Sequence, residues 1–261
     1  MNFKKLLNNP TISRAIFYPR KVEIPSNLES NIIPITLKIS SDITMGGYVF
    51  LNDEKLPSIL YFHGNGEIAL DYHIFAPQFF QCNINLAVVD FRGYGHSTGK
   101  PSYTNLIDDA IPTYDSFQKW LEENSFNNNT FVFGRSLGSI CAAKIGSKEL
   151  ANLKGIIFES GFASTYNLIT HFGINIPALK PEDIAPYSND TQIQNFKYPT
   201  LVIHGTTDFI IPTSEGKLIY KNVPDHLDKK LILINGATHN NIISFTEEYF
   251  DPLCEFILNH K

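Results

Sequence analysis

Short apolar runs recur along the chain, and each is followed by a turn signal and a segment of helical length. Six of these runs are almost entirely apolar instead of alternating with polar positions. They cover residues 59–62, 86–89, 130–133, 155–158, 201–203 and 231–234. Strands buried on both faces of a parallel sheet show this pattern, because neither face meets water. With the helix-length segments between them, the runs predict a doubly wound, mostly parallel α/β sheet.

The same pattern predicts where this regularity changes. Residues 32–39 and 47–51 flank the turn-forming pair Ser41 and Asp42, so we expect an antiparallel pair of strands there. The helix-length segments cover 70–81, 106–123, 139–148 and 214–221. Pro112 lies inside the second of them. Because proline lacks a backbone N–H and crowds the preceding turn, we expect it to kink or split that helix.

The interval 161–198 contains no strand signal and is interrupted by Pro177, Pro181 and Pro186. A long insertion of this kind in a compact domain is usually functional. It is too short to form an independent domain. We therefore expect a single domain over residues 1–261, with a short cap insertion at about 161–198.

Within the insertion, four apolar residues follow one another at spacings of three, three and four: Tyr166, Ile169, Phe172 and Ile176. If this stretch is helical, they form an apolar stripe on one face. One interpretation is ordinary core packing. The other is a small cap that walls an acyl pocket, in which case Tyr166 and Phe172 bind substrate.

Composition restricts the class of protein. The 261 residues are 43% hydrophobic and 18% charged, which is enough for a sizeable core and excludes intrinsic disorder. There are 26 acidic residues against 21 Lys and Arg, so the formal net charge is −5. A nucleic-acid-binding protein usually has a basic tract or a positive charge, and the sequence has neither. We expect no nucleic-acid partner.

Cysteine content and hydropathy bear on the compartment. Cys82, Cys141 and Cys254 are odd in number and far apart, which argues against a disulfide scaffold or a zinc ribbon and favours a reducing compartment. No apolar run approaches the ~18 residues of a membrane span, and the N-terminus lacks the apolar core of a signal peptide. We expect a cytoplasmic protein without a membrane span, a metal or a cofactor. The sequence leaves the oligomeric state open.

The strongest chemical signal is the G-x-S-x-G pattern at 134–138, which lies between a predicted strand and a predicted helix. A nucleophilic serine at such a sharp, strained turn presents its hydroxyl above the sheet. Glycines at either side of Ser136 let neighbouring backbone approach the turn without a Cβ clash. The alternative is a glycine-rich turn with an ordinary serine. The context favours Ser136 as a nucleophile.

A serine hydroxyl needs a base, and eight histidines are candidates. His239 follows the last predicted strand and should lie at the carboxyl edge, where open α/β sheets bind ligands. His226 precedes that strand and should lie at the opposite edge. His204 ends a strand but enters a turn at Gly205. We therefore expect His239 to be the base.

The base needs an acid to orient it, and Asp208 follows the predicted strand 201–203 at the same edge. The chain order is then nucleophile, acid and base, which is the order of this architecture. Glu159 is the main alternative, because it ends the preceding strand. Asp208 has the better turn context, and we expect Glu159 to anchor a loop instead.

Acyl transfer also needs two donors for the developing oxyanion. The backbone N–H of Leu137, directly after the nucleophile, is the first. The second should come from the loop after the strand 59–62, where glycines at 64 and 66 let the backbone turn inward. We expect the N–H of Asn65 to supply it. His63, at the start of the same loop, is expected to brace the loop.

Taken together, these segments resemble the α/β-hydrolase superfamily, and within it the Bem46-like and serine-aminopeptidase-like hydrolases, which include protein depalmitoylases. The matching segments run in order over nearly the whole chain, at 17–19, 63–66, 90–95, 134–138, 204–208 and 236–240. The resemblance implies an α/β-hydrolase fold, the triad Ser136, Asp208 and His239, and oxyanion donors at Asn65 and Leu137. It does not identify a substrate, because the superfamily includes esterases, thioesterases, lipases and peptidases.

The sequence therefore predicts a serine hydrolase that cleaves carboxylic esters of small to medium acyl chains through an acyl-enzyme, with a small-molecule acyl substrate. An acyl-protein thioesterase or depalmitoylase is the first alternative, and a peptidase is the second. A peptidase would need a negative site for the substrate N-terminus, which the sequence does not locate. An alternative of another class is a catalytically idle binding protein with a hydrolase fold.

Overall fold

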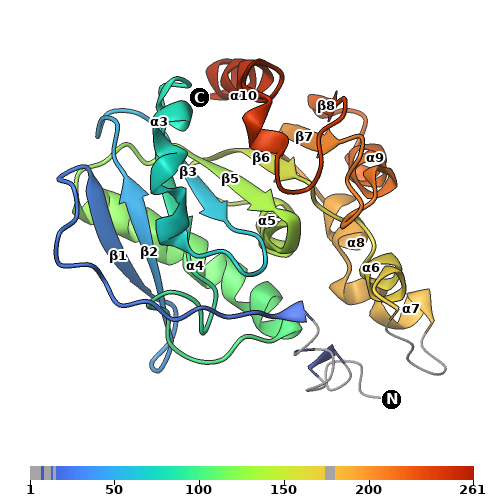
Figure 1. Ribbon diagram of the computed structural model, residues 1–261, viewed down its shortest axis with the longest axis horizontal. Helices are drawn as coiled ribbons and strands as arrows, with labels where there is room; N and C mark the ends of the chain where they lie inside the picture. The colour runs from blue at the N-terminus through green and yellow to red at the C-terminus, as the bar shows by residue number, and fades with distance from the viewer. Residues whose placement is uncertain (1–6, 9–12, 14–15, 174–179) are drawn as a thin grey trace.

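The computed structural model describes residues 7–8, 13, 16–173 and 180–261, and in this part of the chain the strands form one eight-stranded sheet (Figure 1). Along the sheet they follow the order β1-β2-β4-β3-β5-β6-β7-β8. The strands are β1 Ile32–Lys38, β2 Thr44–Phe50, β3 Ser58–Phe62, β4 Asn85–Val89, β5 Thr130–Arg135, β6 Leu153–Glu159, β7 Thr200–Gly205 and β8 Lys229–Ile234. β2 pairs antiparallel with β1 and β4, and all other pairs are parallel. The predicted parallel core and antiparallel pair are confirmed.

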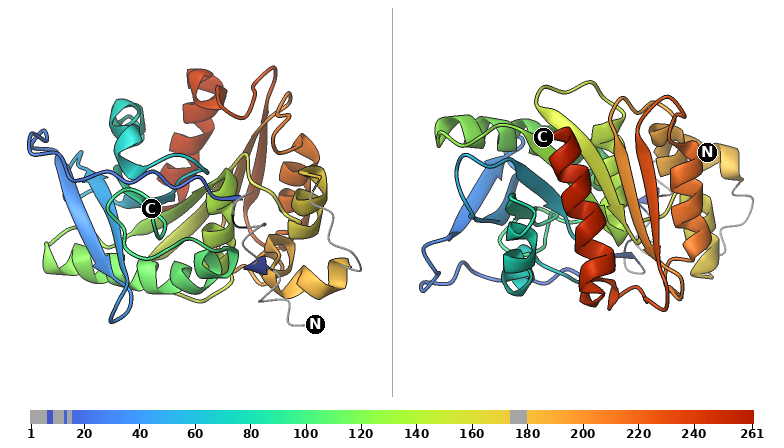
Figure 2. Two further views of the ribbon diagram at one scale, coloured as in Figure 1. Left: turned by 60° about the horizontal axis from the view of Figure 1, so that its bottom comes forward. Right: turned by 90° about the horizontal axis from the view of Figure 1, so that it is seen from above.

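Helices cover both faces of the sheet, so the doubly wound prediction is also confirmed (Figure 2). One hydrophobic cluster joins the sheet to α4, α5 and α9. The other joins the opposite face to α3 and α10. The helices that cover the sheet are α3 Ala76–Phe80, α4 Tyr103–Glu123, α5 Ser139–Gly146, α9 Thr213–Asn222 and α10 Thr246–His260, and a 3₁₀ turn η1 at Ala69–Ile74 precedes α3. The inner strands are completely buried, as expected between two helical layers.

α4 runs unbroken from residue 103 to 123 and buries one face against the core, so Pro112 does not split it. Two other local expectations differ from the structure. The segment 70–81 is not one helix but the 3₁₀ turn η1 followed by α3. β8 lies at the edge of the sheet and is largely half-buried or exposed, so it is not the doubly covered strand that its apolar run suggested.

The insertion 161–198 folds into short helices, and no strand occurs in its described residues. These helices are α6 Thr165–His171, α7 Pro181–Ile184, η3 Ala185–Tyr187 and α8 Asn189–Ile193. The side-chain amide of Asn189 donates to Ser139 Oγ at 3.1 Å, which ties the insertion to α5, and to the Phe162 carbonyl at 2.8 Å, which lies within the insertion. The insertion therefore packs beside α5, the helix that follows the predicted nucleophile.

The cysteine expectation is corrected by the structure. A disulfide joins Cys82, just after α3, to Cys254 in α10, although 172 positions separate them in the sequence. The two helices lie on the same face of the sheet, which brings the two cysteines together. The odd number and wide spacing of the cysteines did not predict this cross-link. Within the described residues, no helix combines the length and apolar character that a membrane crossing requires.

Candidate active site

Ser136 lies on the strained turn that the sequence predicted, between β5 and α5. Its φ of +50° is a left-handed conformation that non-glycine residues rarely adopt. The two flanking glycines are required by close packing. A Cβ on Gly138 would lie 2.0 Å from the Phe62 carbonyl oxygen, and one on Gly134 would lie 2.6 Å from the Gly138 carbonyl oxygen. The turn therefore holds the serine hydroxyl at the carboxyl edge of the sheet.

The structure brings the three predicted triad residues together. His239 Nε2 lies 3.0 Å from Ser136 Oγ, and His239 Nδ1 lies 2.8 Å from Asp208 Oδ2. The three side chains come from the loops after β5, β7 and β8, and all three residues are buried. Serine, imidazole and carboxylate thus form one hydrogen-bonded chain, the arrangement that makes a serine hydroxyl nucleophilic.

Asp208 is held in place by its second carboxylate oxygen. Oδ1 accepts hydrogen bonds from the backbone N–H groups of Ile210, at 3.0 Å, and Ile211, at 2.8 Å. Burial tends to raise the pKa of Asp208, but the hydrogen bond with His239 and the Ile211 N–H outweigh it, so the pKa lies below its usual value. The carboxylate is therefore ionised at neutral pH and aimed at His239.

His204 and Glu159, the two alternatives at this edge, have other partners. His204 Nε2 donates to the Ile211 carbonyl at 2.9 Å and lies 3.5 Å from Asp208 Oδ2. Burial lowers the pKa of His204, which keeps this imidazole neutral beside the acid. Glu159 forms an ion pair with Arg135 and accepts a hydrogen bond from the Tyr249 hydroxyl at 2.5 Å. Glu159 thus anchors neighbouring elements, as the sequence suggested.

The loop after β3 carries the predicted oxyanion donor Asn65. The Asn65 side chain accepts hydrogen bonds from the Tyr94 hydroxyl, at 2.8 Å, and from the Tyr18 backbone N–H, at 3.0 Å. These bonds fix the residue by its side chain, and Gly66 makes the turn that follows with a φ of +79°. His63 is buried, and its Nδ1 contacts the Gly64 carbonyl at 2.7 Å, which is consistent with a bracing role.

A cavity of about 380 Å³ opens over Ser136, and Asn65, Leu137 and His239 also line it. Most of its remaining wall is apolar. The apolar side chains are those of Ile16, Tyr18, Phe162, Leu168, Phe172, Ile210 and Ile211, and Gly64, Glu67 and Asn240 complete the wall. Sequence reasoning missed most of these side chains, because they come from separate segments that only the fold brings together.

The two predicted substrate contacts in the insertion have different positions. Phe172 directly follows α6, lines the cavity and is half exposed. Tyr166 packs against the core and is absent from the cavity wall, where Leu168 lies instead. Ile169 is buried in the core, and Ile176 lies outside the described residues. The apolar stripe is thus divided between core packing and the cavity.

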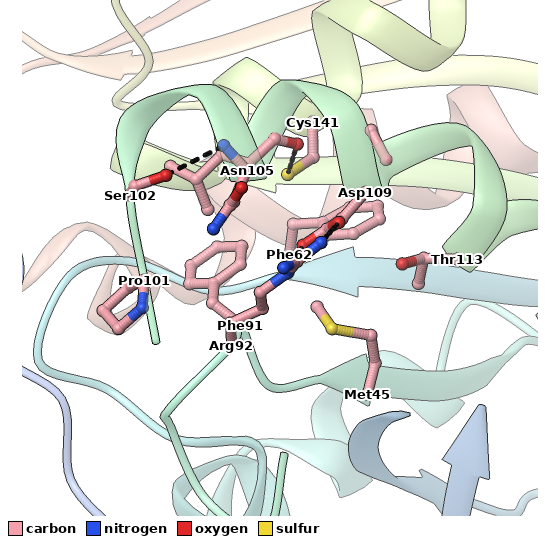
Figure 3. A pocket seen from close by; sticks show the side chains of 12 residues that line it. Met45, Phe62, Phe91, Arg92, Pro101, Ser102, Asn105, Asp109, Thr113 and Cys141 are labelled. Carbon is pink, nitrogen blue, oxygen red and sulfur yellow. Dashed lines mark hydrogen bonds and ion pairs between the residues drawn. The ribbon is translucent and has the colours of Figure 1, made fainter. Parts of the chain in front are cut away.

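A far smaller cavity lies beside the ion pair between Arg92 and Asp109 (Figure 3). Its volume is about 10 Å³, about enough for one water molecule. Cys141 lines it and donates its thiol hydrogen to the Leu106 carbonyl at 3.3 Å. Burial raises the pKa of Cys141 well above its usual value. The thiol therefore stays protonated and is no rival to Ser136 as a nucleophile.

We looked for side chains that could hold a metal ion in the part of the chain that the structure describes. Across residues 7–8, 13, 16–173 and 180–261, no group of three or more His, Cys, Asp or Glu side chains is placed to hold a metal ion. The acidic and histidine side chains around Ser136 are instead engaged with one another and with backbone groups.

Comparisons with known proteins identify relatives of this chain. A family model described as "Serine aminopeptidase, S33" matches residues 53–175. The chain is 26% identical over 244 residues to the protein bem46 of Schizosaccharomyces pombe, a match that covers 90% of this chain and 80% of bem46. It is 30% identical over 247 residues to the uncharacterised protein R595 of Acanthamoeba polyphaga mimivirus, covering 86% of this chain and 81% of R595. Among solved structures, an esterase of Pyrococcus furiosus, Pf2001, is similar with a TM-score of 0.72 at 19% identity, covering 93% of this chain and 98% of Pf2001. At 19% identity, the similarity to Pf2001 shows a shared fold and nothing further.

Proposed function

Because the chain belongs to the Bem46-like family of α/β-hydrolases, we propose that it is a serine hydrolase that cleaves carboxylic esters of small to medium acyl chains. One observation carries this proposal. The hydrogen-bonded chain from Ser136 through His239 to Asp208 opens into a largely apolar cavity. We further propose that residues 1–261 form a single domain, with the insertion 161–198 as its cap.

In the proposed reaction, Ser136 Oγ attacks the ester carbonyl carbon while its proton passes to His239 Nε2. Asp208 holds the imidazole in the tautomer that accepts this proton and stabilises the positive charge that results. The N–H groups of Asn65 and Leu137 donate to the oxyanion. His239 then gives this proton to the leaving oxygen as the bond between that oxygen and the acyl carbon breaks. Water repeats the attack on the acyl-enzyme, releases the acid and returns a proton to Ser136.

The cavity bears on the size of the substrate. A volume of about 380 Å³ lies toward the small end of the roughly 300–1,000 Å³ usual for small-molecule sites. Phe162, Leu168 and Phe172 supply apolar surface for an acyl chain. This combination supports a substrate that combines a short apolar acyl group with a reactive carbonyl near Ser136.

Hydrolysis of peptides and hydrolysis of thioesters would use the same triad, and a third alternative is a protein without catalytic activity. The matching family model is described as a serine aminopeptidase, which keeps peptide hydrolysis as a second candidate. A thioester substrate, as in depalmitoylation, would be attacked in the same way. A panel of acyl esters, acyl thioesters and aminoacyl amides compared by kcat/KM separates these reactions. A non-catalytic binding protein would act on none of them.

The central experiment is covalent labelling with a fluorophosphonate probe. Wild-type protein should react, and Ser136→Ala should not. Ser160→Ala is a matched control, because Ser160 is also a buried serine with positive φ, 46°, and lies just after the adjacent strand β6. It should label like wild type. If Ser136→Ala labels equally while folded, the proposed nucleophile is wrong.

A further inference from the structure

Arg135, the residue directly before the proposed nucleophile, is buried and uses all three of its guanidinium nitrogens. Nε donates to Glu67 Oε1 at 2.9 Å. Nη1 pairs with Glu159 Oε1. Nη2 donates to the backbone carbonyl of His239 at 3.0 Å. The three partners come from the β3 loop, the end of β6 and the loop that carries the proposed base.

The two carboxylates that hold the guanidinium are themselves fixed. Oε2 of Glu67 accepts hydrogen bonds from the Gly64 N–H, at 2.8 Å, and from the Tyr72 hydroxyl, at 2.6 Å. Oε2 of Glu159 accepts one from the Tyr249 hydroxyl at 2.5 Å and one from the Tyr61 hydroxyl at 3.3 Å. Each carboxylate thus has a partner on both oxygens. Arg135 is therefore clamped on two sides, and its third side reaches the His239 backbone.

The charges in this group are maintained at neutral pH. Burial favours the neutral form of Glu67, but the Arg135 charge and the Tyr72 hydroxyl outweigh it and lower the pKa of Glu67 to about 2. Burial also favours neutral Arg135, yet Glu159 and Glu67 raise its pKa well above its usual value. Ionised hydrogen bonds are about twice as strong as neutral ones, so the clamp is rigid.

We propose that Arg135 is a positioning residue, which holds the backbone of His239 so that the imidazole meets Ser136 Oγ. The inference rests on the proposed function, because it assigns to Arg135 a role in proton transfer by His239. Only a planar fork reaches three partners in three directions at once. The ammonium group of lysine keeps the charge but offers a single nitrogen, so it cannot replace all three contacts.

The test is Arg135→Lys, which retains a cation beside the two carboxylates. Misplacing a catalytic group by about 1 Å costs up to ~100-fold in rate. We therefore expect kcat on a p-nitrophenyl ester to fall roughly 10- to 100-fold, with KM changed much less and the circular dichroism spectrum retained. Wild-type kcat in folded Arg135→Lys would overturn the proposal.

A double-mutant cycle separates positioning from a general effect on the fold. If Arg135 acts through His239, Arg135→Lys should lower the residual activity of His239→Ala by less than about threefold. An equal loss in both backgrounds would mean that the arginine acts through the fold and would refute the proposal. Should Arg135→Lys fail to fold, Glu159→Gln frees one side of the clamp. It should lower kcat a few-fold in wild type and leave the His239→Ala background unchanged.

Hydrogen exchange distinguishes failure of this inference from failure of the proposed function. If wild-type protein neither labels with fluorophosphonate nor hydrolyses any substrate of the panel, the proposed function is wrong. Hydrogen exchange of the backbone still shows in that case whether Arg135 holds the loop that carries His239. In Arg135→Lys, peptides spanning 235–241 should exchange at least several-fold faster than in wild type, while peptides from α4 remain unchanged. Unchanged exchange at 235–241 would refute the positioning role whatever the activity.

Discussion

Replacing Asp208 with asparagine tests the proposed triad at the atom where the structure is most specific. The carboxylate faces two different sets of partners. Oδ1 accepts from the backbone N–H groups of Ile210 and Ile211, and Oδ2 faces His239 Nδ1 at 2.8 Å. An asparagine amide has one acceptor oxygen and one donor nitrogen. The two N–H groups require the acceptor, so the amide oxygen must take the Oδ1 position.

This orientation places the Asn NH₂ group against His239 Nδ1. A donor there forces Nδ1 to act as an acceptor, and the imidazole proton moves to Nε2. Nε2 then points a hydrogen at Ser136 Oγ and cannot accept the serine proton. The corresponding change in serine proteases lowers kcat by about 10⁴. Asp208→Asn should therefore lower kcat by about 10⁴, equivalent to about 5 kcal/mol of transition-state stabilisation.

The assay is kcat on p-nitrophenyl butyrate at neutral pH, with thermal unfolding as the check on folding. Glu159→Gln is the comparison, because Glu159 contacts Arg135 and Tyr249 instead of the imidazole. Its loss should be no more than about tenfold, the worth of one weakened hydrogen bond. A folded Asp208→Asn with more than a tenth of wild-type kcat would refute the tautomer argument. If Glu159→Gln lowers kcat more than Asp208→Asn does, Asp208 is not the acid that orients His239.

Three further predictions follow from the cavity, the ion pairs and the disulfide. Along p-nitrophenyl acetate, butyrate and hexanoate, kcat/KM should rise up to about fourfold for each methylene that gains ~0.8 kcal/mol of apolar contact, and it should fall for longer chains. Phe172→Ala should flatten this rise more than it lowers acetate hydrolysis. A kcat/KM that still rises at palmitate would contradict the small cavity. Despite burial, Arg135 lowers the pKa of Glu67 from 4.5 to about 2, so this carboxylate stabilises the folded protein above about pH 4.5 and that contribution is lost as the pH falls toward 2. Urea unfolding of Glu67→Gln should accordingly depend less on pH between 5 and 3 than that of wild type, and parallel curves would contradict the assignment. Reducing the disulfide between Cys82 and Cys254 should lower the free energy of unfolding by about 2–4 kcal/mol. The variant with serine at both positions should have the same lower Tm with and without reductant. A wild-type Tm that does not change on reduction would argue against the cross-link.

Much of the site follows from local sequence, because its chemistry is attached to strand ends. Ser136, Asp208 and His239 each come shortly after a strand, although β8, before His239, lies at the edge of the sheet and is only partly buried. Parallel strands end at the same edge of a sheet, so the apolar runs predict the approximate meeting point of the three side chains before any contact is known. The glycines at 134 and 138 indicate the sharp turn for the same local reason: a Cβ at either position would overlap backbone atoms.

Side-chain contacts between distant segments were not predictable in this way. Cys82 and Cys254 meet only because α3 and α10 pack on one face of the sheet. Phe172 and Tyr166 belong to the same apolar stripe, yet one lines the cavity and the other packs against the core. Periodicity identifies an apolar face but not what covers it, since that depends on how the insertion docks.

The sequence by itself determined most of the strands and the strained turn at Ser136, because each depends on residues close together in the chain, and it placed Ser136, Asp208 and His239 after strand ends. Only the tertiary structure decided the cavity wall and the partners of Arg135. Within the sequence, Arg135 is one variable position of the G-x-S-x-G pattern. Its partners Glu67, Glu159 and the His239 carbonyl lie 68, 24 and 104 positions away. A buried charge needs partners in three dimensions, and no local pattern records which distant groups the fold will bring to it.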